Sequence, residues 1–204
     1  MINVNHIFQI EDNSTFQKIA LQIFNYQYNN IEIYQHYVNC LGIKPESGTN
    51  INEIPFLPIT FFKTNQILSK EKNAQLIFES SGTTGNQVSK HYVANENIYI
   101  QSFTKCFEHF FGSPSQYVIL ALLPSYLERN NSSLVYMMNH LIEHSQKDSG
   151  FYLHNFDELA FKINILKEKK QPTILFGVSF ALLDFLEKYQ FNFPELLVFE
   201  TGGM

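Results

Sequence analysis

Short apolar runs alternate with amphipathic stretches along the last two thirds of the chain. Continuous apolar segments at 75–78, 117–123, 151–153, 173–176 and 196–199 are typical of strands that are buried on both faces. Between them, apolar residues recur at helical spacing over 95–111, 133–145, 157–169 and 179–189. This alternation predicts an α/β fold built on a doubly wound, mostly parallel sheet with flanking helices.

The first 70 residues predict an N-terminal helical lead-in. Ser14 is expected to cap a first helix, and a second helix is expected to end near Gly42. We therefore expect a single domain over residues 1–204, with a helical and extended lead-in at 1–70 and an α/β core at 71–204. Because the sequence stops directly after a strand and a glycine turn, we also expect a truncated C-terminus.

Composition narrows the class of protein. With 204 residues, 45% of them hydrophobic, the chain can bury a substantial core. Its net charge of −5 leaves no broad basic surface for nucleic acid. The N-terminus lacks the pattern of a signal peptide and the apolar runs are too short to span a bilayer, so we expect a cytoplasmic protein. Cys40 and Cys106 are expected to be reduced, buried thiols.

A Ser/Thr/Gly loop follows the first of the apolar strands. Glycine lets a backbone approach an anion closely, hydroxyl groups add donors, and a lysine shortly afterwards supplies a positive charge. This combination predicts a phosphate-binding loop, against the alternatives of a flexible linker or a structural turn. Because each flanking strand is expected to lead into a helix, we expect the loop Ser80–Gly85 to be exposed at the carboxyl edge of the parallel sheet. Its residues are Ser80, Ser81, Gly82, Thr83, Thr84, Gly85 and Lys90.

The loop does not have Walker A spacing, because Lys90 lies five residues beyond Gly85. It resembles the phosphate loop of the adenylate-forming superfamily. Together with the segments PFLPITFFKT (55–64), SKHYV (89–93), LLPSYLERNNSSLVYM (122–137) and LFGVSFALLDF (175–185), it is similar to the acyl-protein synthetase family. That family activates fatty acids in bacterial luminescence systems and their non-luminous relatives. The resemblance extends from about the first third of the chain to its end.

The resemblance implies an ATP-dependent and Mg²⁺-dependent ligase that converts a fatty or related carboxylic acid to an acyl-adenylate. It also implies transfer of the acyl group to a thiol acceptor in the enzyme's own C-terminal region, on a carrier or on a reductase partner. Neither cysteine of this chain matches that acceptor. Lys90 would act on the phosphates, and Gly202 and Gly203 would border the adenine. We expect this chain alone to bind nucleotide weakly and to catalyse little.

Further candidate residues follow predicted parallel strands, at the edge where such sheets bind ligands. Arg129 is a candidate for phosphate or carboxylate binding, and Tyr126 stands near an aromatic or histidine position of adenylating enzymes. Gly177 leaves room for a substrate, and the resemblance makes Phe180 a candidate for lining the acyl pocket. Ordinary loop chemistry at Tyr126 and Arg129, and core packing of Phe180, stay open as alternatives.

One motif suggests different chemistry. His140, Glu143 and His144 match the H-x-x-E-H pattern of inverzincin metallopeptidases. They lie on a predicted crossover helix, and we interpret them as a solvated helix face with no metal. His91 is likewise interpreted as a structural histidine. The sequence therefore leaves two hypotheses for the function: an acyl-adenylating ligase, and a non-catalytic module that binds nucleotide or acyl groups.

Overall fold

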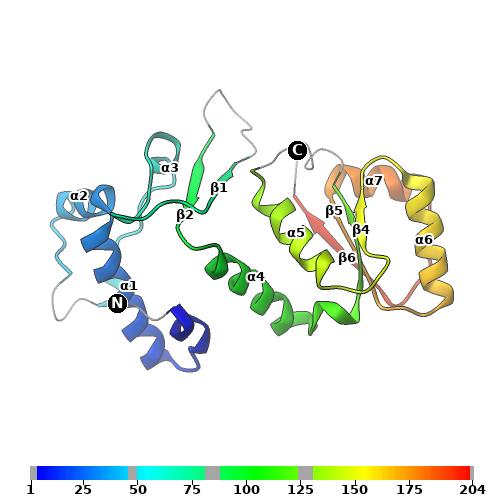
Figure 1. The fold of residues 1–204 in the computed structure, drawn as a ribbon, viewed down its shortest axis with the longest axis horizontal. Coiled ribbons are helices and arrows are strands. Elements are labelled where there is room, and N and C mark those ends of the chain that lie inside the picture. The colour runs from blue at the N-terminus through cyan, green and yellow to red at the C-terminus, as the bar shows by residue number, and fades with distance from the viewer. Residues whose placement is uncertain (1–3, 46–49, 81–87, 124–130, 203–204) are drawn as a thin grey trace. The chain divides into compact units, whose positions relative to one another are not determined.

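The computed structural model describes residues 4–45, 50–80, 88–123 and 131–202 (Figure 1). The chain divides into two compact units, Met1–Ser102 and Phe103–Met204, whose boundary falls within helix α4. The elements of the first unit are η1 (Val4–Gln9), α1 (Asn13–Asn30), α2 (Glu32–Cys40), η2 (Ile51–Glu53), α3 (Phe61–Thr64), β1 (Leu76–Glu79), β2 (Lys90–Val93) and the start of α4 (Glu96–Phe111). The second unit continues with η3 (Pro114–Gln116), β3 (Val118–Leu122), α5 (Ser133–Glu143), β4 (Gly150–Tyr152), α6 (Phe156–Glu168), β5 (Thr173–Val178), α7 (Ser179–Lys188) and β6 (Leu196–Thr201).

The first unit begins with the expected pair of helices, α1 and α2. The cap of α1 is Asp12 and not Ser14, since the Asp12 carboxylate accepts a hydrogen bond from the backbone N–H of Thr15 at 2.8 Å. The carboxylate thereby satisfies one of the free N–H groups of the first turn. Helix α2 ends as predicted near Gly42, whose φ of +71° is easily adopted only by glycine.

A small core holds α1 and α2 together. Phe24, Tyr34 and Val38 are buried there, and the rings of Phe24 and Tyr34 meet edge to face. The Tyr34 hydroxyl donates a hydrogen bond to the carbonyl of Pro55 at 2.7 Å. Burial raises the pKa of Tyr34 to about 12, so this hydroxyl stays protonated as a donor. The extended segment around Pro55 is thus attached to the helices.

Strands β1 and β2 form a two-stranded antiparallel sheet of their own, with Glu79 opposite Lys90. The prediction that Ser80–Gly85 lies at the carboxyl edge of the parallel sheet is therefore wrong. It assumed that β1 leads into a helix. Parallel neighbours need a crossover of a dozen or more residues, whereas a shorter link suffices for an antiparallel pair. The ten residues 80–89 that join β1 to β2 fit the second case.

The second unit contains the predicted parallel sheet. Four strands lie in the order β4-β3-β5-β6, and each neighbouring pair is parallel. All five residues of β3 are buried, as its continuous apolar run indicated. In the register of the central pair, Leu120 lies beside Leu175 and Leu122 beside Gly177. The expectation of an α/β fold with a mostly parallel sheet is confirmed for this unit.

Helices cover both faces of this sheet. Successive strand residues point to opposite faces, and on β5 Phe176 faces α5 while its neighbour Gly177 lies against Leu182 of α7. Helix α5 therefore lies on one face and α7 on the other, and α6 is beside α7 (Figure 1). The rings of Phe156 in α6 and Phe185 in α7 are 5.6 Å apart. The sheet is thus doubly wound.

The two cysteines differ from the expectation. Cys40 and Cys106 are free thiols, as predicted, but both are exposed rather than buried. Each lies on an amphipathic helix, where spacing alone does not say which flank of the apolar face meets solvent. Within the described ranges, no helix combines the length and the apolar character needed to cross a membrane.

Candidate functional site

The parallel sheet has a switch point between its two central strands. The chain leaves β3 through α5 toward β4, and it leaves β5 through α7 toward β6 on the opposite side of the sheet. Where adjacent strands lead away in opposite directions, their carboxyl ends border a crevice that binds ligands in open α/β sheets. The segment after Leu123 and the segment from Ser179 onward begin at this point.

Several predicted site residues lie at or beside this edge. Gly177 is the second last residue of β5, Phe180 is in the first turn of α7, and Gly202 directly follows β6. Phe180 is 38% exposed, so it does not pack in the core. Gly177 is buried, and a Cβ there would lie 2.8 Å from Cγ of Leu182. The space expected for a substrate at Gly177 is thus occupied by Leu182.

Other predicted residues fall outside the described ranges. They are Ser81, Gly82, Thr83, Thr84, Gly85, Tyr126, Arg129 and Gly203. Their assignments stay predictions, and so do those of the described site residues.

A polar contact joins the ends of β5 and β6. The Ser179 hydroxyl donates a hydrogen bond to the Glu200 carboxylate. Both residues lie at the carboxyl edge, because Gly177 pairs with Glu200 in the parallel register. Glu200 is exposed, so one side of its carboxylate remains open to solvent. The edge beside the switch point therefore carries an acidic side chain.

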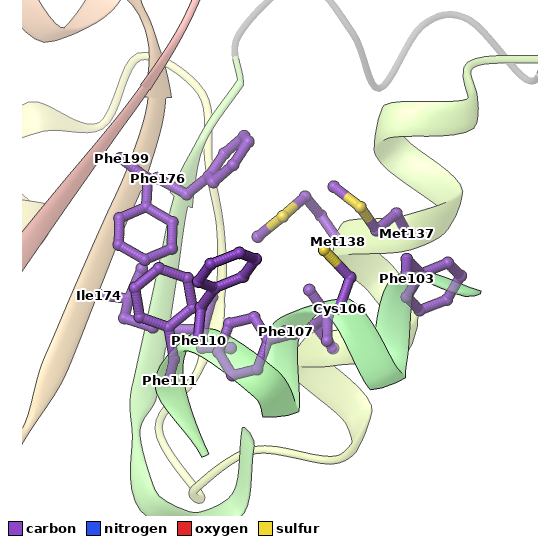
Figure 2. A pocket seen from close by; sticks show the side chains of 12 residues that line it. Phe103, Cys106, Phe107, Phe110, Phe111, Met137, Met138, Ile174, Phe176 and Phe199 are labelled. Carbon is purple, nitrogen blue, oxygen red and sulfur yellow. The ribbon is translucent and has the colours of Figure 1, made fainter. Parts of the chain in front are cut away.

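An apolar pocket of about 210 Å³ lies between one face of the sheet and the helices α4 and α5 (Figure 2). It is lined by Phe103, Cys106, Phe107, Phe110 and Phe111 of α4, by Met137, Met138 and Leu141 of α5, and by Ile119, Ile174, Phe176 and Phe199 of the strands. All these residues belong to the second unit. The lining offers no charged group, so the pocket suits an apolar ligand.

The walls of the pocket differ in stiffness. Phe111 and Phe199 have ring centroids 4.7 Å apart, and Phe107 contacts Phe111 at 5.4 Å. Such packed rings have few alternative rotamers. On the opposite side, Met137 and Met138 have flexible side chains that fill irregular gaps (Figure 2). One wall is therefore rigid while the other can adjust to a ligand.

The first unit holds the base of the predicted phosphate loop. Ser80 and Ser89 exchange two hydrogen bonds of 3.0 Å, from Ser80 N to Ser89 O and from Ser89 N to Ser80 Oγ. Next to them, the Lys90 ammonium lies 3.2 Å from Oε1 of Glu79. The hairpin thus closes the two ends of the segment 81–87 and places a cation at its base. His91 contacts the ring of Phe62, in keeping with a structural role.

The H-x-x-E-H residues do not form a metal site. The His140 ring stacks on His144 at 4.2 Å and meets Phe103 edge to face, while Glu143 accepts a hydrogen bond from Asn139. Glu143 and His144 are exposed, as predicted, and His140 is half-buried. Within the described part of the chain, no group of three or more His, Cys, Asp or Glu side chains is placed to hold a metal ion.

We expect the packing of His140 to make folding sensitive to acid. Burial lowers the pKa of His140, the positive charge of His144 lowers it further, and Glu143 acts in the opposite direction. Since the unfolded state then binds protons more readily, the free energy of unfolding should fall as pH drops from about 6.5 through the lowered pKa. Replacing His140 by Gln should flatten this dependence in urea unfolding between pH 7.5 and 5. The exposed His154→Gln variant is the control, and an unchanged slope in His140→Gln would contradict the assignment.

Sequence reasoning missed two features of these sites. It did not pair Glu79 with Lys90, although the ten residues between the two strands are too few for a parallel crossover. It recognised an apolar face on residues 95–111 but not that this face lines a pocket. Periodicity identifies which residues face inward; it does not report how completely they fill the space.

These observations define a doubly wound α/β protein with an apolar pocket beside its switch point. No protein-family profile matches the chain. A stretch of 71 residues, 34% of the chain, is 35% identical to the long-chain-fatty-acid–luciferin-component ligase of Photorhabdus luminescens, and the match spans 60% of that ligase. The chain is therefore distantly related to a ligase of this kind.

Proposed function

We propose that the protein is an ATP-dependent ligase that activates a fatty acid. The apolar pocket beside the switch point is the observation that carries this proposal. Its uncharged lining suits an alkyl chain, which would be transferred from water at a gain of about 0.8 kcal/mol for each buried methylene. The name of the distant relative, a long-chain-fatty-acid ligase, supports the same substrate class.

We place the polar end of such a substrate at the adjacent carboxyl edge, where the proposed contact with Arg129 has to offset the negative charge of Glu200. In α/β sheets this edge borders the reactive end of the ligand, and the proposed reaction has the carboxylate oxygen attack the α-phosphorus of ATP. The bond from that phosphorus to the bridging oxygen breaks, and pyrophosphate leaves. Arg129 and Tyr126 are proposed to bind at this edge, together with Phe180. Gly202 and Gly203 are proposed to border the adenine.

The loop Ser80–Gly85 and Lys90 are proposed to bind the phosphates of ATP. Lys90 fits this role because its ammonium lies at the base of the loop, on the hairpin of β1 and β2, and pairs with the carboxylate of Glu79. A phosphate oxygen would take the place of that carboxylate. Mg²⁺ would be held largely by phosphate oxygens and would neutralise their charge. The acyl group is then proposed to pass to a thiol, on the enzyme, a carrier or a reductase.

Acid-dependent exchange of pyrophosphate into ATP tests this function in the full-length protein. We expect exchange that requires Mg²⁺ and a fatty acid, because formation of the acyl-adenylate is reversible. Nucleotide binding without exchange would contradict the ligase and support a non-catalytic binding module. Exchange that proceeds equally well with short hydrophilic acids would contradict the role of the apolar pocket.

A further inference from the structure

The apolar pocket extends along the strand direction. On β5, Phe176 lies nearer the carboxyl end than Ile174. Helix α5 begins at the carboxyl edge, after β3, so Met137 lies nearer that edge than Leu141. Helix α4 ends shortly before the start of β3, which places Phe110 toward the amino ends of the strands. The pocket therefore has a half near the switch point and a half away from it.

The volume of the pocket is small for a long alkyl chain. A cavity of about 150 Å³ lined by apolar side chains binds benzene, which has six carbon atoms. By proportion, the 210 Å³ pocket accommodates roughly eight carbon atoms. A long-chain acid has more carbons than this, so part of such a chain has to lie outside the pocket.

One wall of the pocket is open to solvent. Phe110 is 70% exposed and Cys106 is exposed, although both line the pocket. The floor and the opposite side are closed, since Ile119, Ile174 and Leu141 are buried. Cys106 and Phe110 lie one helical turn apart on the same face of α4. They form an open apolar side of the pocket through which a chain can leave, with Phe110 at the end away from the switch point.

We propose that the pocket encloses only about the first eight carbons of a fatty acid and that the rest of the chain leaves past Cys106 and Phe110. This inference rests on the proposed function and makes the pocket a limited alkyl subsite. Each methylene enclosed should raise affinity about fourfold. Each methylene beyond the opening, lying on a half-open surface, should raise it less than twofold.

The chain-length dependence of affinity is the first test. Displacement of a fluorescent apolar probe from the full-length protein gives affinities for straight-chain acids of six to sixteen carbons and for n-alcohols of the same lengths. This range extends below and above the expected limit of about eight carbons. We expect the slope to break near eight carbons in both series. A constant slope through sixteen carbons would overturn the proposal. Because alcohols lack a carboxylate, they test the alkyl subsite independently of acid activation.

The two exposed cysteines supply the second test within one sample. Iodoacetamide labelling, followed by mass spectrometry, compares Cys106 at the opening with Cys40 in the other unit. Saturating dodecanoic acid or dodecanol should slow labelling of Cys106 at least fivefold and leave Cys40 unchanged, whereas hexanoic acid should protect Cys106 less. Displacement of the probe without protection of Cys106 would overturn the proposed opening while leaving the ligase function standing.

Variants at the two cysteines complete the design. Cys106→Trp narrows the opening at an exposed position. It should therefore weaken the affinity for dodecanoic acid about tenfold, the equivalent of about two buried methylenes, and the affinity for hexanoic acid less than twofold. Cys40→Trp is the matched control and should leave both affinities unchanged. Equal effects of Cys106→Trp on both acids would overturn the proposal. Binding and protection by alcohols in a protein that lacks acid-dependent exchange would support the subsite and refute the ligase.

Discussion

Replacing Lys90 by alanine is expected to lower acid-dependent pyrophosphate exchange by about two to three orders of magnitude. This is the usual loss when one donor that stabilises developing charge is removed from an active site. The free energy of unfolding should change by less than about 1 kcal/mol, because the pair with Glu79 is a surface pair and such pairs contribute little. The side chains of Lys90 and Glu79 are 47% and 31% exposed. Exchange kinetics and urea unfolding of the same preparation measure the two effects.

Glu79→Gln is the matched control for this experiment. It removes the same ion pair but keeps the lysine, so it should alter stability as little as Lys90→Ala and leave exchange within a few fold of the original protein. If Lys90 merely stabilises the hairpin, the two variants would behave alike. A folded Lys90→Ala variant with unchanged exchange would remove Lys90 from the proposed mechanism.

The second unit was predictable from sequence because its signals are strong. The strand at 117–123 is continuously apolar, as a central parallel strand has to be, and it became β3 with every residue buried. The helix expected at 95–111 is α4, which ends in this unit before Gly112, whose φ is +78°. Local chemistry and periodicity agreed at these positions.

The first unit was less predictable because its decisive contacts are between segments. The run 75–78 looks like any other buried strand, yet β1 pairs with β2 rather than with the parallel sheet. Strand propensity does not identify the partner of a strand; the length of the connection does. Similarly, both Asp12 and Ser14 are good helix caps, and the choice of Asp12 depends on where the backbone turns.

The candidate site was only partly predictable for the same reason. The location of Phe180 and Gly202 after parallel strands was predictable because strand direction follows from the alternation of strands and helices, whereas their roles come from the resemblance and stay predictions. The pocket depends on how rings from three elements pack, for example Phe111 against Phe199, which are 88 residues apart. No local pattern encodes such a distance.

The second large effect is expected from a substitution at Gly177 and concerns the stability of the fold. Replacing it by alanine should lower the free energy of unfolding by about 1–3 kcal/mol, the usual result of adding a methyl group to a well-packed core. The new Cβ would lie 2.8 Å from Cγ of Leu182 and 3.3 Å from the backbone oxygen of Leu122. Leu182 is buried and the oxygen belongs to a central strand, so neither moves away easily. Gly150→Ala on β4 is the control, because no atom lies within 4 Å of its added Cβ.

The contact with Leu182 can be separated from a contact with substrate by a double-mutant cycle. In a Leu182→Ala background the added methyl group has space, so Gly177→Ala should cost less than in the original protein, with a coupling energy of about 0.5–3 kcal/mol. Urea unfolding of the four proteins measures this coupling. If the glycine serves packing alone, the folded double variant should exchange pyrophosphate as the Leu182→Ala variant does. An equal destabilisation by Gly177→Ala in both backgrounds would show that Leu182 is not what requires glycine at this position.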